Sequence, residues 1–416
     1  MITYFKLAFR NVFRNRRRSI ITFFAVTLGI FSYIVMEGVL DAFSSQSVEN
    51  LKKIDTAHIK IFAEGYWDER AKEPLKHRID NYKEIERRIM QMDNVQAVSP
   101  RITFGTNIYF SRTSLPIIGI AMGVTEEENP VFKLKDWIIK GEYFEEGRYS
   151  LVGRELAEDM KLDVGSWITI EFKDKNGIYD AEQLQVSGIF NTGHPDIDSS
   201  TLYVPLGLMQ ERLDMQNSVT EIATILDSEE RIERSRDNIQ QMLKQKFNPR
   251  QEFEVLTWKE QAESYIAFQD FKNMGGFVMI WILIIIIVIG IMNTMLMSVY
   301  ERVREIGALM ALGMKKSRVR LLFLLEGAIV GGFGAIIGMG LGLLFMYYLS
   351  ESGFDIAAMY GEQDIGYIVK DIVYGSIRIG PFIQAFLIGV ISAVIATYIP
   401  ASNASKLNPA DALRKY

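Results

Sequence analysis

The chain of 416 residues contains no cysteine and only three histidines, His58, His77 and His194. Without cysteine there can be no disulfide framework, thiolate metal site or cysteine nucleophile. The histidines are far apart in the sequence, which argues against a metal site built from several imidazoles. The phosphate-loop pattern G-x-x-x-x-G-K-S/T, the nucleophile elbow G-x-S-x-G and the zinc pattern H-E-x-x-H are also missing. We therefore expect no catalytic residue, metal or cofactor on this chain.

Charged residues are nearly absent from four long stretches, which cover residues 19–41, 273–300, 321–350 and 379–405. A helix of about 20 apolar residues can cross the hydrocarbon core of a bilayer. Since each stretch reaches that length, we predict four transmembrane helices. Glu37 and Glu326 are ionisable residues inside two of these spans. Each lies near a span end, where pairing or contact with the surface is a simpler explanation than a proton relay.

The basic residues predict how the spans are oriented. Segments 1–18, 301–320 and 406–416 together hold 15 basic and three acidic residues, whereas 42–272 and 351–378 hold 31 basic and 45 acidic ones. Lysine and arginine accumulate in cytoplasmic loops. We therefore expect a multi-pass protein of the inner membrane with both termini in the cytoplasm. The basic residues are then anchors facing anionic lipid, and nucleic-acid binding is not expected.

The long segment 42–272 alternates strand-like and helix-like runs and predicts a large extracytoplasmic α+β domain. Its middle, about 125–195, is rich in strands and predicts an inserted subdomain. Its last helix, Lys259–Lys272, is expected to continue directly into the second span. Before the first span, residues 1–18 predict an amphipathic helix that lies on the cytoplasmic membrane surface. Residues 351–378 form a short outer loop, and 406–416 form a cytoplasmic tail.

The loop 301–320 begins with a short amphipathic helix between the second and third spans. Its first turn is charged, its following residues are apolar, and a glycine ends it. A short helix of this kind can lie along the membrane and fit a groove in a partner protein. We therefore predict a docking element with the contact residues Glu301, Arg302, Arg304, Glu305, Gly307 and Gly313.

The third span is rich in glycines that stand four residues apart. Small residues at this spacing allow two helix backbones to approach closely. We predict tight helix packing, within one subunit or between two subunits, at Gly327, Gly331, Gly334, Gly338 and Gly342.

Residues 293–326 resemble the signature of the FtsX-like permeases of ABC transporters, the type VII class. The resemblance extends over the whole chain, at Arg10–Ser19, Gly153–Gly165, Val186–Phe190 and Pro400–Arg414. It implies a four-span permease that works by mechanotransmission and has porter-like and sabre-like parts in its outer domain. It also implies two permeases docked on a dimer of a separate ABC ATPase, which would hold the ATP and Mg. Residues 301–313 would be the coupling helix that touches this ATPase.

Two further stretches, Ile118–Pro130 and Gly193–Pro205, look most like the lipoprotein-releasing LolC/LolE type. The hairpin at about 171–183, where a LolC-like hook for a periplasmic carrier would lie, is short and lacks proline. The chain is therefore more similar to LolE. This resemblance implies a LolD-like ATPase, a second copy or paralogue, lipoprotein cargo and a periplasmic carrier. MacB-like export of drugs, peptides or other amphiphiles with a separate ATPase stays open, as does FtsX-like regulation of a cell-wall hydrolase.

A lipoprotein cargo needs apolar surface along its whole path, because its acyl chains are costly to expose to water. We predict that the first two spans line a cavity for these chains, and the alternative for each residue is simple lipid contact. The candidates are Phe23, Phe24, Val26, Ile30 and Phe31 on the first span, and Val278, Trp281, Ile282, Ile285 and Ile289 on the second.

Overall fold

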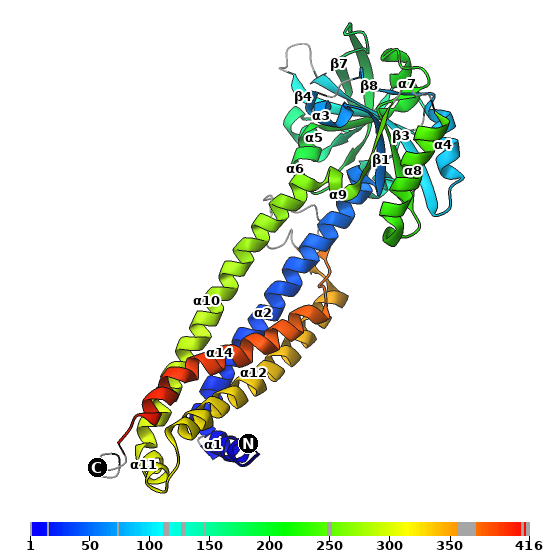
Figure 1. Cartoon of the computed structure of the whole chain (residues 1–416). Coiled ribbons are helices and arrows are strands. Elements are labelled where there is room, and N and C mark those ends of the chain that lie inside the picture. The colour runs from blue at the N-terminus through cyan, green and yellow to red at the C-terminus, as the bar shows by residue number, and fades with distance from the viewer. Residues whose placement is uncertain are drawn as a thin grey trace. The chain divides into compact units, whose positions relative to one another are not determined.

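The computed structural model of the chain describes residues 2–14, 16–72, 75–110, 116–125, 130–144, 146–247, 252–355, 372–408 and Ala412. The chain divides into two compact units (Figure 1). We call the first, made of Met1–Phe43, Gln269–Asp355 and Ile372–Tyr416, the helical unit. The second, made of Ser44–Phe268 and Ile356–Asp371, is the α/β unit.

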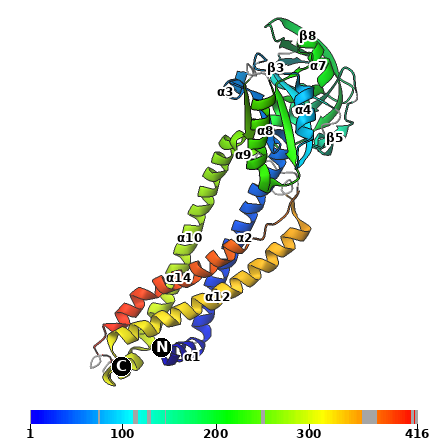
Figure 2. The same cartoon turned by 45° about the vertical axis from the view of Figure 1, so that its right-hand side comes forward.

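Four helices of the described chain are long and apolar enough to cross a membrane, which confirms the four predicted spans. They are α2 (Arg16–Leu51), α10 (Glu263–Glu301), α12 (Lys316–Ser352) and α14 (Ile379–Ser405). Two shorter helices, α1 (Ile2–Arg14) and α11 (Val303–Ala311), belong to the same unit. Helices α12 and α14 run side by side (Figures 1 and 2).

The two predicted boundaries of the extracytoplasmic domain, residues 42 and 272, both lie inside long helices. Helix α2 extends ten residues past Asp41 to Leu51, and a five-residue π-helix, Lys52–Thr56, follows it. On the other side, Thr257 and Glu260 form a capping box at the start of α9 (Trp258–Gln261). After a break at Ala262, α10 runs as one helix to Glu301.

The α/β unit is built on a ten-stranded sheet with the order β12-β1-β11-β3-β4-β9-β6-β8-β5, and β7 pairs with both β3 and β8. Since β7 connects β3 to β8, the strands β3, β4, β9, β6, β8 and β7 close into a ring. The strands are β1 (Ile59–Ala63), β3 (Val95–Tyr109), β4 (Ile117–Val124), β5 (Ile138–Gly141), β6 (Tyr149–Gly153), β7 (Trp167–Lys173), β8 (Tyr179–Phe190), β9 (Thr201–Pro205), β11 (Glu221–Leu226) and β12 (Phe253–Thr257).

The predicted insert 125–195 contributes β5, β6, β7 and β8 to this sheet. These strands pair with β3 and β9, which lie outside the insert, as well as with one another. The insert therefore shares one sheet with the flanking chain. Two small antiparallel pairs complete the strands: β2 (Ile79–Asp80) with β10 (Ser218–Val219), and β13 (Phe354–Asp355) with β14 (Ile372–Val373).

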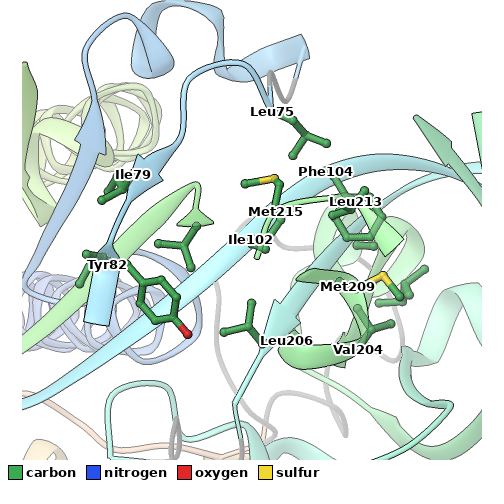
Figure 3. Packing of buried hydrophobic residues seen from close by; sticks show 14 of the residues in the cluster. Leu75, Ile79, Tyr82, Ile102, Phe104, Val204, Leu206, Met209, Leu213 and Met215 are labelled. Atoms are coloured by element: carbon green, nitrogen blue, oxygen red, sulfur yellow. The ribbon is translucent and has the colours of Figure 1, made fainter. Parts of the chain in front are cut away.

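Short helices cover the sheet and bury apolar faces at helical spacing. In α4 (Tyr82–Met90), Tyr82, Ile85 and Ile89 are buried, while Glu84 and Arg88 pair on the exposed side. Figure 3 shows the core into which such faces point, with side chains contributed by β3, β9 and the segment 204–215. The other helices are α3 (Tyr66–Glu69), α5 (Arg154–Met160), α6 (Pro195–Ser200), α7 (Leu206–Arg212) and α8 (Ile232–Lys246).

Two predicted segments lie largely outside the described residues. In the outer loop 351–378, residues 356–371 are outside, and in the tail 406–416 residues 409–411 and 413–416 are outside. The predicted hairpin near 171–183 is described, and it consists of β7 and β8 joined by a turn at 174–178. Gly177 adopts a φ of 81° in this turn, a value that glycine reaches without strain.

Candidate functional site

Helix α11 is a separate nine-residue helix between the second and third spans. Helix α10 ends because Arg302 leaves helical geometry, with φ −105° and ψ 15°, and the ladder restarts where the Ile306 N–H donates to the Arg302 carbonyl at 2.9 Å. Gly313 follows the C-cap of α11 and adopts a φ of 94°, a backbone conformation that favours glycine. A short helix with fixed ends therefore stands at the position predicted for docking.

One side of α11 is packed and the other is exposed. Val303, Ile306 and Gly307 are buried, and Ile306 joins a cluster with Val299, Val319, Phe323, Ala401 and Ala404. Glu301, Arg304, Glu305 and Gly313 are exposed, and the side chain of Leu312 is 87% exposed. The segment 301–313 therefore exposes charged groups and one large apolar side chain.

Arg302 does not belong to that exposed surface. Its Nη1 lies 3.0 and 2.9 Å from the two carboxylate oxygens of Glu326 on α12, and its Nε donates to Glu305 at 3.0 Å. The Asn11 side-chain amide also donates to Glu326, at 2.7 Å, and Arg14 pairs with Glu305. We call these five residues the junction network. Burial raises the pKa of Glu305, but Arg302 and Arg14 outweigh this effect and hold the net pKa below its ordinary value.

The structure therefore corrects two of the predicted docking residues. Arg302 is 8% exposed and satisfied by two carboxylates, and Gly307 is buried under the packed side of α11. Neither can reach a partner unless the packing opens. Glu326 was not predicted as its partner because 24 residues separate the two. The available signal was the tendency of ionisable residues in spans to pair with one another.

The glycines of α12 lie in two contacts inside the chain. A Cβ placed on Gly331 would lie 2.5 Å from the Cβ of Ala393, and one on Gly327 would lie 2.2 Å from the Thr397 hydroxyl. These two glycines therefore pack against α14. The other three, Gly334, Gly338 and Gly342, pack against α2 instead.

Two residues of the predicted cavity, Val26 and Ile30, lie instead in the contact between α12 and α2. Val26 and Ile30 are fully buried, and they are the side chains that a Cβ on Gly334 or Gly338 would meet, at 2.8 and 2.9 Å. They are packing residues of a helix contact, so they do not line a cavity. Phe23 and Phe31 are half-buried.

Phe24 and Phe31 line a groove of about 540 Å³ between α2 and α12. Its remaining lining residues are Thr27, Leu28, Leu341, Leu344, Phe345 and Tyr348, so it contains no residue of α10. The candidates on the two spans therefore do not share this groove.

Helix α10 is the least covered of the four spans. Within its most apolar stretch 12% of the residues are buried, against 44% in α12. Ile287 packs against Gly29 of α2, which holds α10 by a narrow stripe. The predicted second-span residues all lie on the uncovered part, with exposures of 47–57%: Val278, Trp281, Ile282, Ile285 and Ile289.

A polar cluster around Asp198 in the α/β unit has a structural role. The buried carboxylate of Asp198 accepts hydrogen bonds from the backbone N–H groups of Thr192 and Gly193 and from the Thr192 hydroxyl. It closes the turn that precedes α6. Among the described residues, no three acidic or histidine side chains gather as a metal site would require.

Comparison with known proteins gives two matches along the chain. Residues 19–242 match the MacB-like periplasmic core domain, and residues 277–409 match the FtsX-like permease C-terminal domain. An uncharacterized ABC transporter permease of Methanocaldococcus jannaschii is 24% identical over 98% of this chain and 96% of its own length. The macrolide export ATP-binding/permease protein MacB of Vibrio parahaemolyticus is 24% identical over 99% of this chain.

The chain spans 59% of the length of that MacB protein. Among solved structures, the periplasmic region of MacB from Actinobacillus actinomycetemcomitans is similar at 16% identity. The match covers 53% of this chain and 97% of that structure, with a TM-score of 0.38.

Proposed function

Because the chain belongs to the FtsX-like ABC transporter permease family and carries a MacB-like periplasmic core domain, we propose that it extracts lipoproteins from the inner membrane. In this proposal both termini and α11 face the cytoplasm, where a separate ATPase subunit hydrolyses ATP. The permease is not itself an enzyme. It passes the motion of the ATPase to the periplasmic domain, which hands the cargo to a carrier.

The continuity of helix α10 is the observation that carries the proposal. This is one helix from Glu263, which follows the short helix α9 within the α/β unit, to Glu301, one residue before α11. A displacement of α11 can therefore reach the domain through a single helical rod. The exposed surface of α11, with Arg304 and Leu312, is the part that we assign to the ATPase.

The uncovered apolar face of α10 supports a functional unit of two permeases. Contiguous exposed apolar patches mark interaction surfaces or lipid contacts. In our proposal two copies, or this chain and a paralogue, face each other across a cavity into which this face points. Trp281 and Ile285 lie near the middle of the face and contact cargo there.

The energetics of the cargo favour such a cavity. Removing one CH₂ group from the bilayer costs about 0.8 kcal/mol, so exposing three acyl chains to water costs on the order of tens of kcal/mol. No single ATP supplies that amount. The acyl chains must therefore remain in contact with apolar side chains while closure of the two copies moves them outward.

Release of a purified triacylated lipoprotein from proteoliposomes, with the ATPase that co-purifies with the chain, tests the proposal. Ile285→Asp is expected to abolish ATP-driven release while the complex still assembles and hydrolyses ATP. Ile391→Asp is the matched control, because Ile391 on α14 has the same 53% exposure. Photo-crosslinkers at position 285 should capture the lipoprotein. Capture of phospholipid alone, with release unchanged when the chain is omitted, would contradict lipoprotein extraction.

Export of a drug or another amphiphile is the second candidate. Its support is that relatives named for macrolide export match 99% of this chain. The same proteoliposomes distinguish the two, because a macrolide exporter transports a fluorescent macrolide and leaves the lipoprotein in the membrane.

A further inference from the structure

The structure assigns a positioning role to Glu326. We propose that Glu326, acting through Arg302 and Asn11, fixes the angle at which α11 leaves α10 and makes α1, α11 and α12 move as one body. This inference rests on the proposed role of α11 as the coupling helix. It adds that the motion of the ATPase is delivered to three helices together and not to α10 alone.

The place of Arg302 in the backbone is the first support. Arg302 is the single residue between the last residue of α10 and the first residue of α11. The angle between these helices therefore depends on its backbone dihedrals. Its side chain is held on both edges, by Glu326 at 2.9 and 3.0 Å and by Glu305 at 3.0 Å. Its guanidinium also lies 5.3 Å from the ring centre of Phe323, one turn before Glu326.

The attachment of α1 is the second support, and it uses the same carboxylate. Asn11 donates to Glu326, while Ala8 is fully buried against Leu322 and Ile329 of α12. The rings of Phe9 and Phe13 lie 6.1 and 6.4 Å from that of Phe333. One face of the amphipathic helix therefore binds α12 along three turns, and Glu326 is the polar centre of that contact.

The physics of buried ion pairs favours position over stability as the role of this pair. Arg302 and Glu326 are 8% and 3% exposed, so both have lost most of their hydration. The loss of hydration offsets much of the attraction, and apolar replacements of the same volume can be as stable. What an apolar replacement cannot supply is a directional contact that joins three separate elements at one point. Glu326 therefore keeps the helices in register, and Arg302 transfers that register to the turn into α11.

The test measures helix positions in the full-length chain in lipid nanodiscs. Because the chain has no cysteine, spin labels can be placed at Phe5→Cys on α1 and Leu312→Cys at the C-cap of α11, which are 51% and 87% exposed. The expected distance distribution is a single narrow peak. In Glu326→Gln, which keeps the shape of the side chain but removes its charge, we expect the narrow peak to be lost. Asp41→Asn is the matched control, because Asp41 pairs with Arg378 and Ser376 elsewhere in the same unit, and it should leave the peak unchanged.

A conservative variant separates a positioning role from a general loss of stability. The conservative variant Glu326→Asp keeps the carboxylate that Arg302 and Asn11 contact and is expected to keep the narrow peak. Thermal unfolding of each variant shows whether the single change acts on the whole fold. If Glu326→Gln does not fold, Asn11→Ala removes only the link to α1 and should broaden the same distance. A narrow peak in Glu326→Gln or in Asn11→Ala, or loss of the narrow peak in Glu326→Asp, would overturn the inference. The measurement needs neither ATPase nor cargo, so it can fail while the proposed function stands.

Discussion

Replacing Gly338 by alanine tests the contact between α12 and α2 at its narrowest point. A Cβ at this position would lie 2.7 Å from the Thr27 carbonyl oxygen and 2.9 Å from the Ile30 Cβ, so backbone atoms would have to move apart. Forcing an extra methyl group into a packed interior costs about 1–3 kcal/mol. The helix itself gains roughly 0.5–1 kcal/mol from Gly→Ala, because alanine loses less chain entropy. We therefore expect Gly338→Ala to lower the free energy of unfolding.

Gly340→Ala is the control for this prediction. Gly340 lies two residues away on the same helix, and no atom lies within 4 Å of the position where its Cβ would be. The helical gain of roughly 0.5–1 kcal/mol then applies without the steric cost. Thermal and denaturant unfolding of the purified full-length chain should place Gly340→Ala at or above the wild type and Gly338→Ala clearly below it. Equal stability of the two variants would refute the packing described for α12 and α2.

Three further predictions address the ATPase contact, the second copy and the α/β unit. Arg304→Glu should detach the ATPase or uncouple hydrolysis from transport, whereas Arg318→Glu on the first turn of α12 should not. Co-purification and ATP turnover measure both effects, and full coupling in Arg304→Glu would contradict the docking surface. A single cysteine at Ile285 should cross-link two copies in membranes, whereas one at Ile287, which is 5% exposed, should not; equal cross-linking at both positions would contradict an interface on the uncovered face of α10. Burial lowers the pKa of His58 in the folded chain; Lys52 adds to this effect and Glu229 opposes it. The unfolded chain therefore binds the proton more readily than the folded chain, and the free energy of unfolding should fall as the pH drops below about 6.5. Unfolding of the full-length chain between pH 8 and pH 5 checks this slope, and His58→Asn should flatten it.

The four spans and the short helix α11 could be predicted because each is a local property of the sequence. A run of apolar residues defines a span wherever it occurs, and Gly313 ends α11 by its own backbone freedom. The closeness of helices at the α12 glycines also followed from their spacing. Which helices they contact did not, because Gly327 and Gly331 meet α14 while the other three glycines meet α2.

The errors arose where the partner of a residue is distant in sequence. In α2 both Val26 and Phe24 are apolar, and nothing in a uniformly apolar helix shows that Val26 is buried and Phe24 is 65% exposed. Arg302 looked like a surface charge because its partner Glu326 belongs to another helix. The closed ring of strands was equally hidden, since it depends on the pairing of β7 with β3, about 60 residues earlier in the chain.

The central claim is that an ATPase docked on α11, through its cycle of ATP binding and hydrolysis, moves the periplasmic domains of two permease copies. The most direct measurement places a spin label at Ile178→Cys, which is 64% exposed on the turn between β7 and β8. In the complex with its ATPase, the distance between the labels of the two copies should change when a non-hydrolysable ATP analogue is added. The change should disappear in Arg304→Glu. An inter-copy distance that is the same with and without nucleotide, in a complex that hydrolyses ATP and releases cargo, would contradict the account.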